Sequence, residues 1–396
     1  MMARESELID PLVSGRRGAQ TMISSLNIQG YRGFQQFEMS SLGRVNLLVG
    51  TNNSGKTSVL EAIFLLSSAG DPFAMWQMLW RRGERLPQGP MQENDRPQRR
   101  ARIELDVAHM FYGHEVQPGS TIRISSENQS SHRMMQYRVE EISPRDQPDL
   151  FGVEDEGPLT SRLVLLMEGV PKPQALIVPL TRSGGIHSEM LETASRRGRM
   201  RLSEASSNYF VTTDSLGSDE LIGLWNKIAL TSAEGLVLRA LQFLDPKIER
   251  IASQAPGAPY YLPLSRGGFI IKHRDFEQPI PIGSMGDGMW RMLAMAIAIT
   301  QCKGGVLLVD EIDTGLHYTV MAKMWRLIFN AAKEFDVQVF ATTHSSDCVY
   351  SLAELWKEVD QNNTISLQRI EPNKSHSIPY DEEELAIAAE KEIEVR

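Results

Sequence analysis

Apolar residues alternate, cluster and recur along this chain in patterns that predict a mixed α/β protein. Residues 23–37 (ISSLNIQGYRGFQQF) alternate apolar and polar positions around two glycines, which predicts a strand, a tight turn and a second strand. Residues 45–49 (VNLLV) form the short apolar run of a buried strand. A helical pattern follows, with Val59, Ile63 and Leu66 on one face.

The middle of the chain changes character twice. Residues 82–100 are rich in Pro, Gly and polar residues and predict a loop. Residues 101–181 then carry β-like runs separated by polar linkers (RIELDV, STIRIS, RLVLLM and ALIVPL), which predict an antiparallel lobe. Helical patterns dominate residues 187–251, including Glu220–Ile228 and Glu234–Leu244.

The last part alternates strand and helix patterns, as a parallel α/β sheet requires. The predicted elements are strand 269–272, helix 287–301, strand 306–309, helix 318–332 and strand 337–341. We therefore expect an α/β fold with a mostly parallel sheet, an antiparallel β lobe and a helical insertion lobe.

These patterns divide the chain into five predicted segments. Residues 1–21 have charge, Ser and Gly but no apolar core of a secretory signal, and are expected to be a loose tail. Residues 22–182 and 262–372 form the two parts of one head, and residues 183–261 a helical lobe between them. Residues 373–396 form an acidic terminal helix.

Composition narrows the functional classes. The formal net charge of -9 excludes a surface that is basic throughout, although it leaves room for local basic patches. No apolar run reaches the roughly 18 residues of a membrane span, so no membrane partner is expected. Cys302 and Cys348 give neither a disulfide framework nor a metal-ligand spacing, which favours a reduced, cytoplasmic compartment.

A phosphate-binding loop lies between the predicted strand 45–49 and the helix after it. Gly50–Thr57 reads GTNNSGKT and fits G-x-x-x-x-G-K-[ST] at every fixed position. Backbone N–H groups of such a loop cradle phosphate oxygens, the lysine reaches the β- and γ-phosphates, and the threonine hydroxyl ligates Mg²⁺. The residues expected to bind ATP are Gly50, Asn52, Asn53, Ser54, Gly55, Lys56, Thr57 and Ser58.

An acidic pair ends the predicted strand 306–309 (VLLVDEID). Ligands of open α/β sheets bind at the carboxyl ends of the strands, so these side chains are expected at the nucleotide. Asp310 is the candidate for holding Mg²⁺ together with Thr57, because Mg²⁺ prefers hard oxygen ligands. Glu311 is the candidate general base for the attacking water.

Two further signals are open to more than one interpretation. His344 follows the predicted strand 337–341, where its imidazole is either a sensor of the γ-phosphate or a structural residue. Residues 284–288 (SMGDG) precede the long helix, either as an anion-binding turn or as an ordinary helix N-cap with an acidic first turn.

With these motifs in order, the chain resembles the ABC-type ATPase heads of the RecF and structural-maintenance-of-chromosomes (SMC) class. It is most similar to stand-alone bacterial ATPases related to the overcoming-lysogenization-defect (OLD) proteins. The matching features are GYRGF at residues 30–34, GTNNSGKT, SMGDG, DEIDTGLH and TTHSSD. SMGDG lacks the second adjacent glycine of the usual signature, and no lid glutamine is identified.

The resemblance implies a head-to-head homodimer with two nucleotides between the heads. Ser284 and Gly286 are then expected to contact the γ-phosphate bound by the partner chain. Asp313 is expected at the dimer interface, aligning the attacking water. Arg32 is expected near the phosphates or the adenine, its alternative being an ordinary turn arginine. Glu311, His344 and Lys56 form the expected catalytic set.

Three biological roles remain open from the sequence. The resemblance favours an ATPase subunit that controls a separate nuclease or toxin effector in bacterial defence. A RecF-like repair ATPase that binds DNA is the first alternative, and a transporter-type ATPase the second. Basic clusters that could contact DNA, or equally form solvated faces, are Arg196, Arg197, Arg199 and Arg201, and Arg81, Arg82 and Arg85. The segment after His344 is expected to be too short for the OLD nuclease domain.

Overall fold

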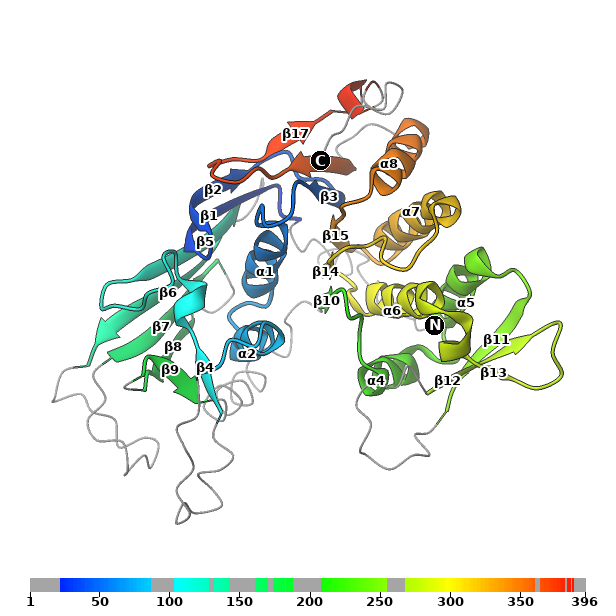
Figure 1. The fold of residues 1–396 in the computed structure, drawn as a ribbon, viewed down its shortest axis with the longest axis horizontal. Helices are drawn as coiled ribbons and strands as arrows, with labels where there is room; N and C mark the ends of the chain where they lie inside the picture. Colours follow the sequence, from blue (N-terminus) through cyan, green and yellow to red (C-terminus); the bar gives the residue numbers. More distant parts are fainter. Residues whose placement is uncertain are drawn as a thin grey trace, which may run out of the picture.

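The computed structural model describes residues 22–86, 103–127, 132–142, 161–169, 174–181, 183–187, 208–254, 268–359, 364–381, 383–385 and 387. The predicted N-terminal tail lies outside the described residues, as do residues 382, 386 and 388–396 of the predicted acidic C-terminal helix; Ile378–Tyr380, in the described part of that segment, form the strand β17 and not a helix. The described chain is built on two six-stranded sheets with helices between and beside them (Figure 1).

The central sheet is mostly parallel, as predicted. Its strand order is β10 (Tyr209–Val211), β14 (Val306–Val309), β15 (Gln338–Thr342), β3 (Val45–Val49), β16 (Ile365–Arg369) and β17 (Ile378–Tyr380). All neighbouring pairs are parallel except β16 and β17. The carboxyl ends of β3, β14 and β15 therefore meet at one edge of the sheet, which is where the predicted motifs lie.

The second sheet is antiparallel and forms the predicted β lobe. Its order is β2 (Phe34–Met39), β1 (Ser25–Tyr31), β5 (Thr121–Glu127), β6 (His132–Glu141), β7 (Ser161–Glu168) and β8 (Gln174–Pro179). A separate short sheet pairs β4 (Glu104–Asp106) with β9 (Gly185–His187). A 3₁₀ turn, η2 (Ala108–Met110), follows β4 in the chain.

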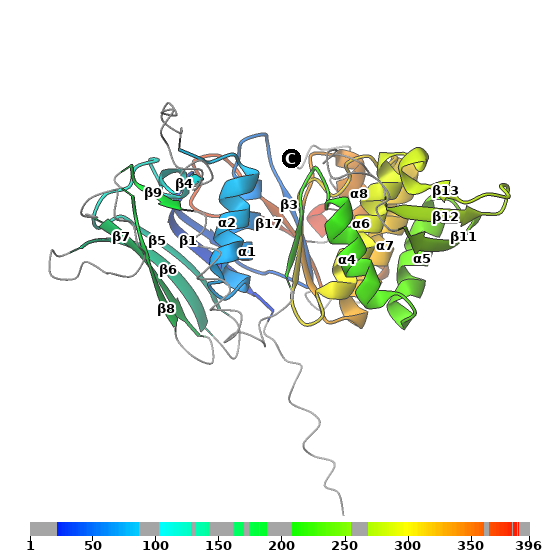
Figure 2. The same cartoon turned by 90° about the horizontal axis from the view of Figure 1, so that it is seen from below.

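Helices α1 (Lys56–Ser67) and α2 (Pro72–Arg81) lie between the two sheets (Figure 2). α1 contacts β5 and β6 of the antiparallel sheet on one side and β14 and β15 of the central sheet on the other. The helix that follows the phosphate loop is therefore buried from both sides, and its position is fixed by both sheets.

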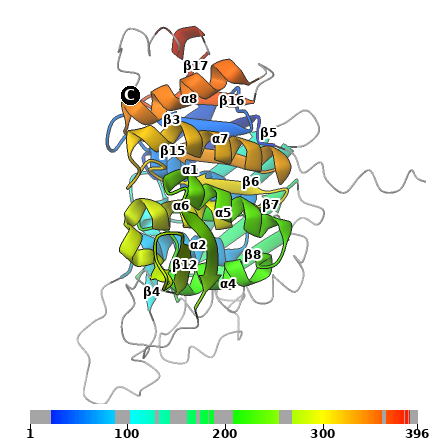
Figure 3. The same ribbon diagram turned by 90° about the vertical axis from the view of Figure 1, so that its right-hand side faces the viewer.

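The opposite face of the central sheet is covered by α6 (Asp287–Gln301), α7 (Tyr318–Glu334) and α8 (Ser346–Glu358) (Figure 3). α4 (Ser218–Ile228) and α5 (Ser232–Leu244) pack against α6. A small sheet of β11 (Ile248–Ser253), β12 (Phe269–His273) and β13 (Ile280–Pro281) lies beyond them, and a 3₁₀ turn, η3 (Ile282–Met285), leads into α6. α4 and α5 thus share one hydrophobic core with the central sheet. The predicted segment boundaries themselves stay a prediction.

The two hydrophobic cores lie on opposite faces of the central sheet. Along β3, Val45, Leu47 and Val49 belong to the core under α6, whereas Leu48 belongs to the core around α1. This division follows from the period of two in side-chain direction along a strand. α6 is apolar nearly all round because other helices and the sheet surround it, and no described helix is long and apolar enough to cross a membrane.

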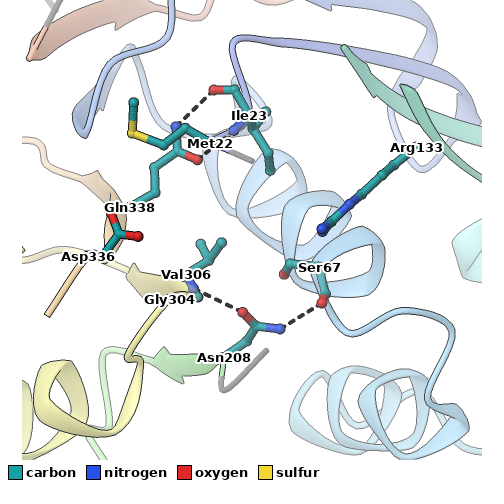
Figure 4. Close-up of a pocket in the computed structure, with 10 residues that line it drawn as sticks. Met22, Ile23, Ser67, Arg133, Asn208, Gly304, Val306, Asp336 and Gln338 are labelled. Atoms are coloured by element: carbon teal, nitrogen blue, oxygen red, sulfur yellow. Dashed lines mark hydrogen bonds between the residues drawn. The ribbon is translucent and has the colours of Figure 1, made fainter. Parts of the chain in front are cut away.

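Hydrogen bonds close the amino ends of the central strands (Figure 4). The side chain of Asn208 accepts from Val306 N at 2.9 Å and donates to Ser67 O at 2.7 Å. The side chain of Gln338 accepts from Ile23 N and donates to Ile23 O, each at 2.8 Å. These amides satisfy buried main-chain groups and tie α1 and the first strand to the central sheet.

Most predicted elements are confirmed, α6 at both of its ends and β14 likewise. The strands β6, β9, β13, β16 and β17 and the helix α8 were not predicted, and the strand β11 begins within the stretch 187–251 for which helical patterns were predicted. β10 was also missed, because its three residues are too few to show alternation within a stretch dominated by helical patterns.

Candidate functional site

The phosphate loop leaves β3 and enters α1 in a backbone conformation that requires glycine. Gly50 and Gly55 have φ angles of 147° and 100°, which side chains with a Cβ rarely adopt. A Cβ at Gly55 would lie 2.4 Å from the ring of Phe34, and one at Gly50 would lie 2.2 Å from the carbonyl oxygen of Ile370. Both glycines are therefore required by conformation and by space.

The other residues of the loop fit a bound phosphate. α1 begins at Lys56, so its free N–H groups and positive end open onto the loop. Ser54 Oγ is buried and has no hydrogen-bond partner within the described part of the chain. Asn52 and Asn53 are exposed, and Ser58 lies half-buried in the first turn of α1. A buried hydroxyl without a partner beside a helix N-terminus suits an oxyanion.

Lys56 points back over the loop. Its Nζ donates to the carbonyl oxygens of Gly50 and Thr51, each at 2.8 Å, and the residue is 5% exposed. Burial lowers the pKa of Lys56 to about 8, and the negative charges of Asp310 and Glu311 oppose this shift. The ammonium group is thus held beside the acidic pair at the edge of the loop.

Asp310 and Thr57 meet although 253 positions separate them in sequence. Thr57 Oγ1 donates to Asp310 Oδ2 at 3.0 Å, and Thr342 Oγ1 donates to Asp310 Oδ1 at 2.6 Å. A carboxylate and a hydroxyl oxygen side by side are ligands that suit Mg²⁺, which keeps several waters and takes few protein ligands. The donor set of the structure therefore fits the predicted magnesium site.

Glu311 adopts an unusual backbone conformation directly after the strand. Its φ is +47°, in the left-handed region that non-glycine residues enter at a cost. Its N–H donates to Thr342 Oγ1 at 2.8 Å, and Thr314 Oγ1 donates to Glu311 Oε2 at 3.3 Å. The carboxylate is half-buried at the edge of the sheet, as the role of general base requires.

His344 and Asp313 lie next to this pair. Burial lowers the pKa of His344, and the charge of Lys56 lowers it further, against the opposing charges of Glu311, Asp313 and Asp310. The imidazole is therefore neutral at pH 7. Thr343 Oγ1 donates to Asp313 Oδ1 at 2.5 Å, which joins the two strand ends.

The SMGDG turn occupies a different part of the chain. Ser284 lies in η3, Gly286 has φ +91° and precedes α6, and both are exposed. Gly288 packs so closely on Gly315 that an added Cβ would lie 2.5 Å from the Gly315 carbonyl oxygen. The open cavity beside this turn is lined by none of the phosphate-loop residues. Within one chain, the signature and the phosphate loop form separate surfaces.

Arg32 is committed to a buried charge cluster. The residue is 5% exposed, and its guanidinium pairs with Glu61 at 2.8 Å and with Glu84 at 2.6 Å. Arg82 also pairs with Glu61, at 2.6 Å. These contacts account for Arg32 as a structural residue of the β1–β2 turn, and its contact with the nucleotide stays a prediction.

A family model described as "AAA domain, putative AbiEii toxin, Type IV TA system" matches residues 45–347, from the strand before the phosphate loop to the segment after His344. The match spans most of the chain and both ends of the site.

The chain belongs to this AAA-domain family. It is an AAA-type ATPase, as predicted, and the short match to RecF agrees with the resemblance to RecF-type heads.

The chain is also similar to individual proteins. An ATP/GTP phosphatase of Helicobacter pylori is 20% identical over 377 residues, which cover 90% of this chain and 95% of the relative. The DNA replication and repair protein RecF of Idiomarina loihiensis is 46% identical over 44 residues, which cover 11% of this chain and 12% of RecF. A crystal structure of an SMC head bound to the C-winged helix domain of ScpA is 14% identical, covers 91% of this chain and 97% of that chain, and has a TM-score of 0.47.

In the predicted basic cluster that the structure describes, Arg81, Arg82 and Arg85 are exposed, and each contacts a neighbouring side chain. Arg81 lies over the ring of Phe210, with 5.5 Å from its guanidinium carbon to the ring centroid, and burial lowers its pKa. Arg85 lies 3.6 Å over the ring of Trp80. The remaining predicted cluster, Arg196, Arg197, Arg199 and Arg201, lies outside the described residues.

Two site residues were missed by the sequence reasoning. Thr342 contacts both Asp310 and Glu311, and it stands in the TTHSSD run that carries His344. Arg291 donates to main-chain oxygens of the acidic pair from α6. The signal for Arg291 was present in the sequence, since it is the one charged residue in an otherwise apolar stretch, residues 288–300.

Proposed function

We propose that this ATPase binds ATP with Mg²⁺ and hydrolyses it as a head-to-head homodimer, so that nucleotide opens and closes the dimer as a switch. The observation that carries the hydrolytic site is the meeting of Thr57 and Asp310 at 3.0 Å, beside Lys56 and Glu311. The four side chains come from the N-terminus of α1 and the carboxyl end of β14, at the sheet edge where ligands of α/β proteins bind.

Each residue has a defined task in the proposed reaction. Lys56 and the N–H groups of the loop bind the phosphates, and Thr57 and Asp310 hold Mg²⁺, which neutralises developing charge when it is bound. Glu311 accepts the proton of the attacking water. Neutral His344 donates a hydrogen bond to the γ-phosphate, and Asp313 aligns the water at the interface.

The dimer is proposed because the signature turn and the phosphate loop do not line the same cavity in one chain. Ser284 and Gly286 are exposed and lie on a cavity that excludes the phosphate loop. A second copy, related by a two-fold axis, would place its signature against the first copy's loop and receive the same in return. The same arrangement would give the exposed Ser284, which precedes α6, a role in the partner's nucleotide site.

A mixing experiment tests the shared site. Lys56→Ala breaks the loop and Ser284→Arg breaks the signature, so each variant alone is expected to be inactive. A mixed dimer contains one intact site, and random pairing restores about a quarter of the wild-type rate. Mixing Lys56→Ala with Glu311→Gln is the matched control. Lys56 and Glu311 of one chain serve the same nucleotide, so each of the two sites in this mixed dimer carries one of the changes and no activity is restored. Activity of Ser284→Arg alone would rule out the shared site.

The biological role follows less directly. We propose that the ATPase controls a separate nuclease or toxin effector in bacterial defence, an assignment supported by the family's description as a putative toxin of a type IV toxin–antitoxin system. The RecF match supports a second role, action on DNA. Turnover stimulated by linear duplex DNA would favour the DNA role, and a DNA-indifferent rate would favour the effector.

A further inference from the structure

Arg291 connects three elements that meet at the acidic pair. It stands on α6, about one turn into the helix, and is 3% exposed. Its Nη2 donates to Asp310 O at 2.5 Å and to Glu311 O at 3.1 Å, and its Nη1 donates to Thr212 O, just beyond β10. One guanidinium thus holds the main chain at the ends of two neighbouring strands.

The buried positive charge of Arg291 is surrounded by carboxylates of the site. Burial lowers the pKa of Arg291 to about 10, and the charges of Asp310, Asp313, Glu311 and Asp214 oppose this shift. A guanidinium is costly to bury unless its donors and charge are satisfied. Here carbonyl oxygens accept from Nη1 and Nη2, and the neighbouring carboxylates balance the charge, whereas the buried Nε has no hydrogen-bond partner within the described part of the chain.

The Glu311 peptide is the part of the site that most needs to be held. Its φ of +47° is unfavourable for a residue with a Cβ. The N–H of Glu311 donates to Thr342 Oγ1, and its carbonyl oxygen accepts from Arg291 Nη2 and from the Thr314 N–H, so contacts on both sides fix the Glu311 main chain. Without Arg291, the peptide loses one of these contacts and can relax toward the ordinary region.

Arg291 also links this peptide to the signature. α6 begins directly after Gly286, and Arg291 lies five residues further along the same helix. Any displacement of the signature turn that moves α6 along its axis moves the guanidinium relative to the Asp310 and Glu311 carbonyls. The site of one chain is thereby connected to the surface that, in the proposed dimer, contacts the partner's nucleotide.

We infer that Arg291 is a positioning residue for hydrolysis: it holds the Glu311 main chain in its strained conformation so that the carboxylate faces the water, and it makes this placement depend on α6. The inference rests on the proposed hydrolysis at this site. It concerns the rate of the chemical step, because Arg291 touches neither the loop nor Thr57 among the contacts of the described residues.

The test compares Arg291→Met and Arg291→Lys with Arg44→Met. Arg44 is a matched control, since its Nη1 donates to the carbonyl oxygens of Ala332 and Val337 and pairs with Asp336 at the amino ends of the strands. Single-turnover hydrolysis, the Kd for a non-hydrolysable ATP analogue and the melting temperature are measured for each variant. Arg291→Lys keeps a positively charged group that can donate to the carbonyl oxygens. It is the variant to measure if Arg291→Met does not fold.

Arg291→Met is expected to slow hydrolysis by about tenfold or more, because an error near 1 Å in a reacting group costs up to about 10²-fold. Its Kd should stay within about twofold of wild type, and Arg291→Lys should recover part of the rate. Arg44→Met should keep the wild-type rate at a similar loss of melting temperature. A hydrolysis rate in Arg291→Met that stays at the wild-type level, as in the Arg44→Met control, would overturn the inference.

A double variant separates positioning from general structure. If Arg291 acts through Glu311, adding Arg291→Met to Glu311→Gln should slow single-turnover hydrolysis no further. Additive losses would show that Arg291 supports some other part of the chain, against the inference. Absence of hydrolysis in the wild-type protein would instead refute the proposed function, so the two failures are distinguishable.

Discussion

The low pKa of Lys56 predicts that ATP binding weakens as the pH rises through 8. Burial lowers the pKa of this lysine to about 8 from the ordinary value of 10.5. The phosphates of ATP are bound by the protonated ammonium form, and their negative charge stabilises that form further. Above pH 8 Lys56 of the free protein therefore has to take up a proton before ATP binds. Because this protonation becomes less favourable as the pH rises, the apparent affinity for ATP falls.

The size of the effect follows from the pKa. If only the protonated form binds, the apparent Kd increases as 1 + 10^(pH − pKa), which is about tenfold between pH 7 and pH 9. A lysine with its ordinary pKa would change the Kd by only about 3% over the same range. Other groups interfere little, because the pKa of His344 is lowered from 6.5 and a terminal phosphate titrates near pH 6.

Titration calorimetry with a non-hydrolysable ATP analogue measures both the affinity and the number of protons taken up on binding. At pH 8.5 the binding enthalpy should depend on the ionisation enthalpy of the buffer, with uptake of roughly three quarters of a proton. Lys56→Met should bind weakly, with no proton uptake. A wild-type Kd that stays constant between pH 7 and pH 9 would refute the reasoning, because it would mean that the lysine is already protonated in the free protein.

Three further outcomes are expected. Glu311→Gln should lower the rate of phosphate release by roughly 10²–10⁴-fold while leaving the Kd for ATP intact; an unchanged rate would remove Glu311 as the base. Gly55→Ala should abolish nucleotide binding, because its Cβ would meet the Phe34 ring at 2.4 Å, whereas Gly33→Ala has nothing within 4 Å and should bind normally in the same calorimeter. Trp225→Ala should lower the free energy of unfolding by about 3–5 kcal/mol in urea denaturation, since the residue is 3% exposed in the core; a loss near zero would contradict its place there.

The local parts of the site could be predicted because their information is local. GTNNSGKT needs a strand before it and a helix after it, and both are written in the adjacent residues. The boundaries of α6 were readable for the same reason, with small residues before it and an apolar stretch within it that only Arg291 interrupts. Elements without such signals were missed, most clearly β10, whose three residues form a strand only because β14 pairs with them.

The sequence by itself determined the chemistry of this protein: a phosphate loop, an acidic pair and a histidine, each at the end of a predicted strand. Only the tertiary structure decided which of these groups meet. Pairing of β3 with β15 and of β15 with β14 brings Thr57 to Asp310 and Thr342 to Glu311, across separations that no local pattern encodes. The same packing turned Arg32 into a buried partner of Glu61 and Glu84, and an apolar helix into the support of Arg291. Strand order and burial are properties of the whole chain, because each contact exists only after distant segments have packed together.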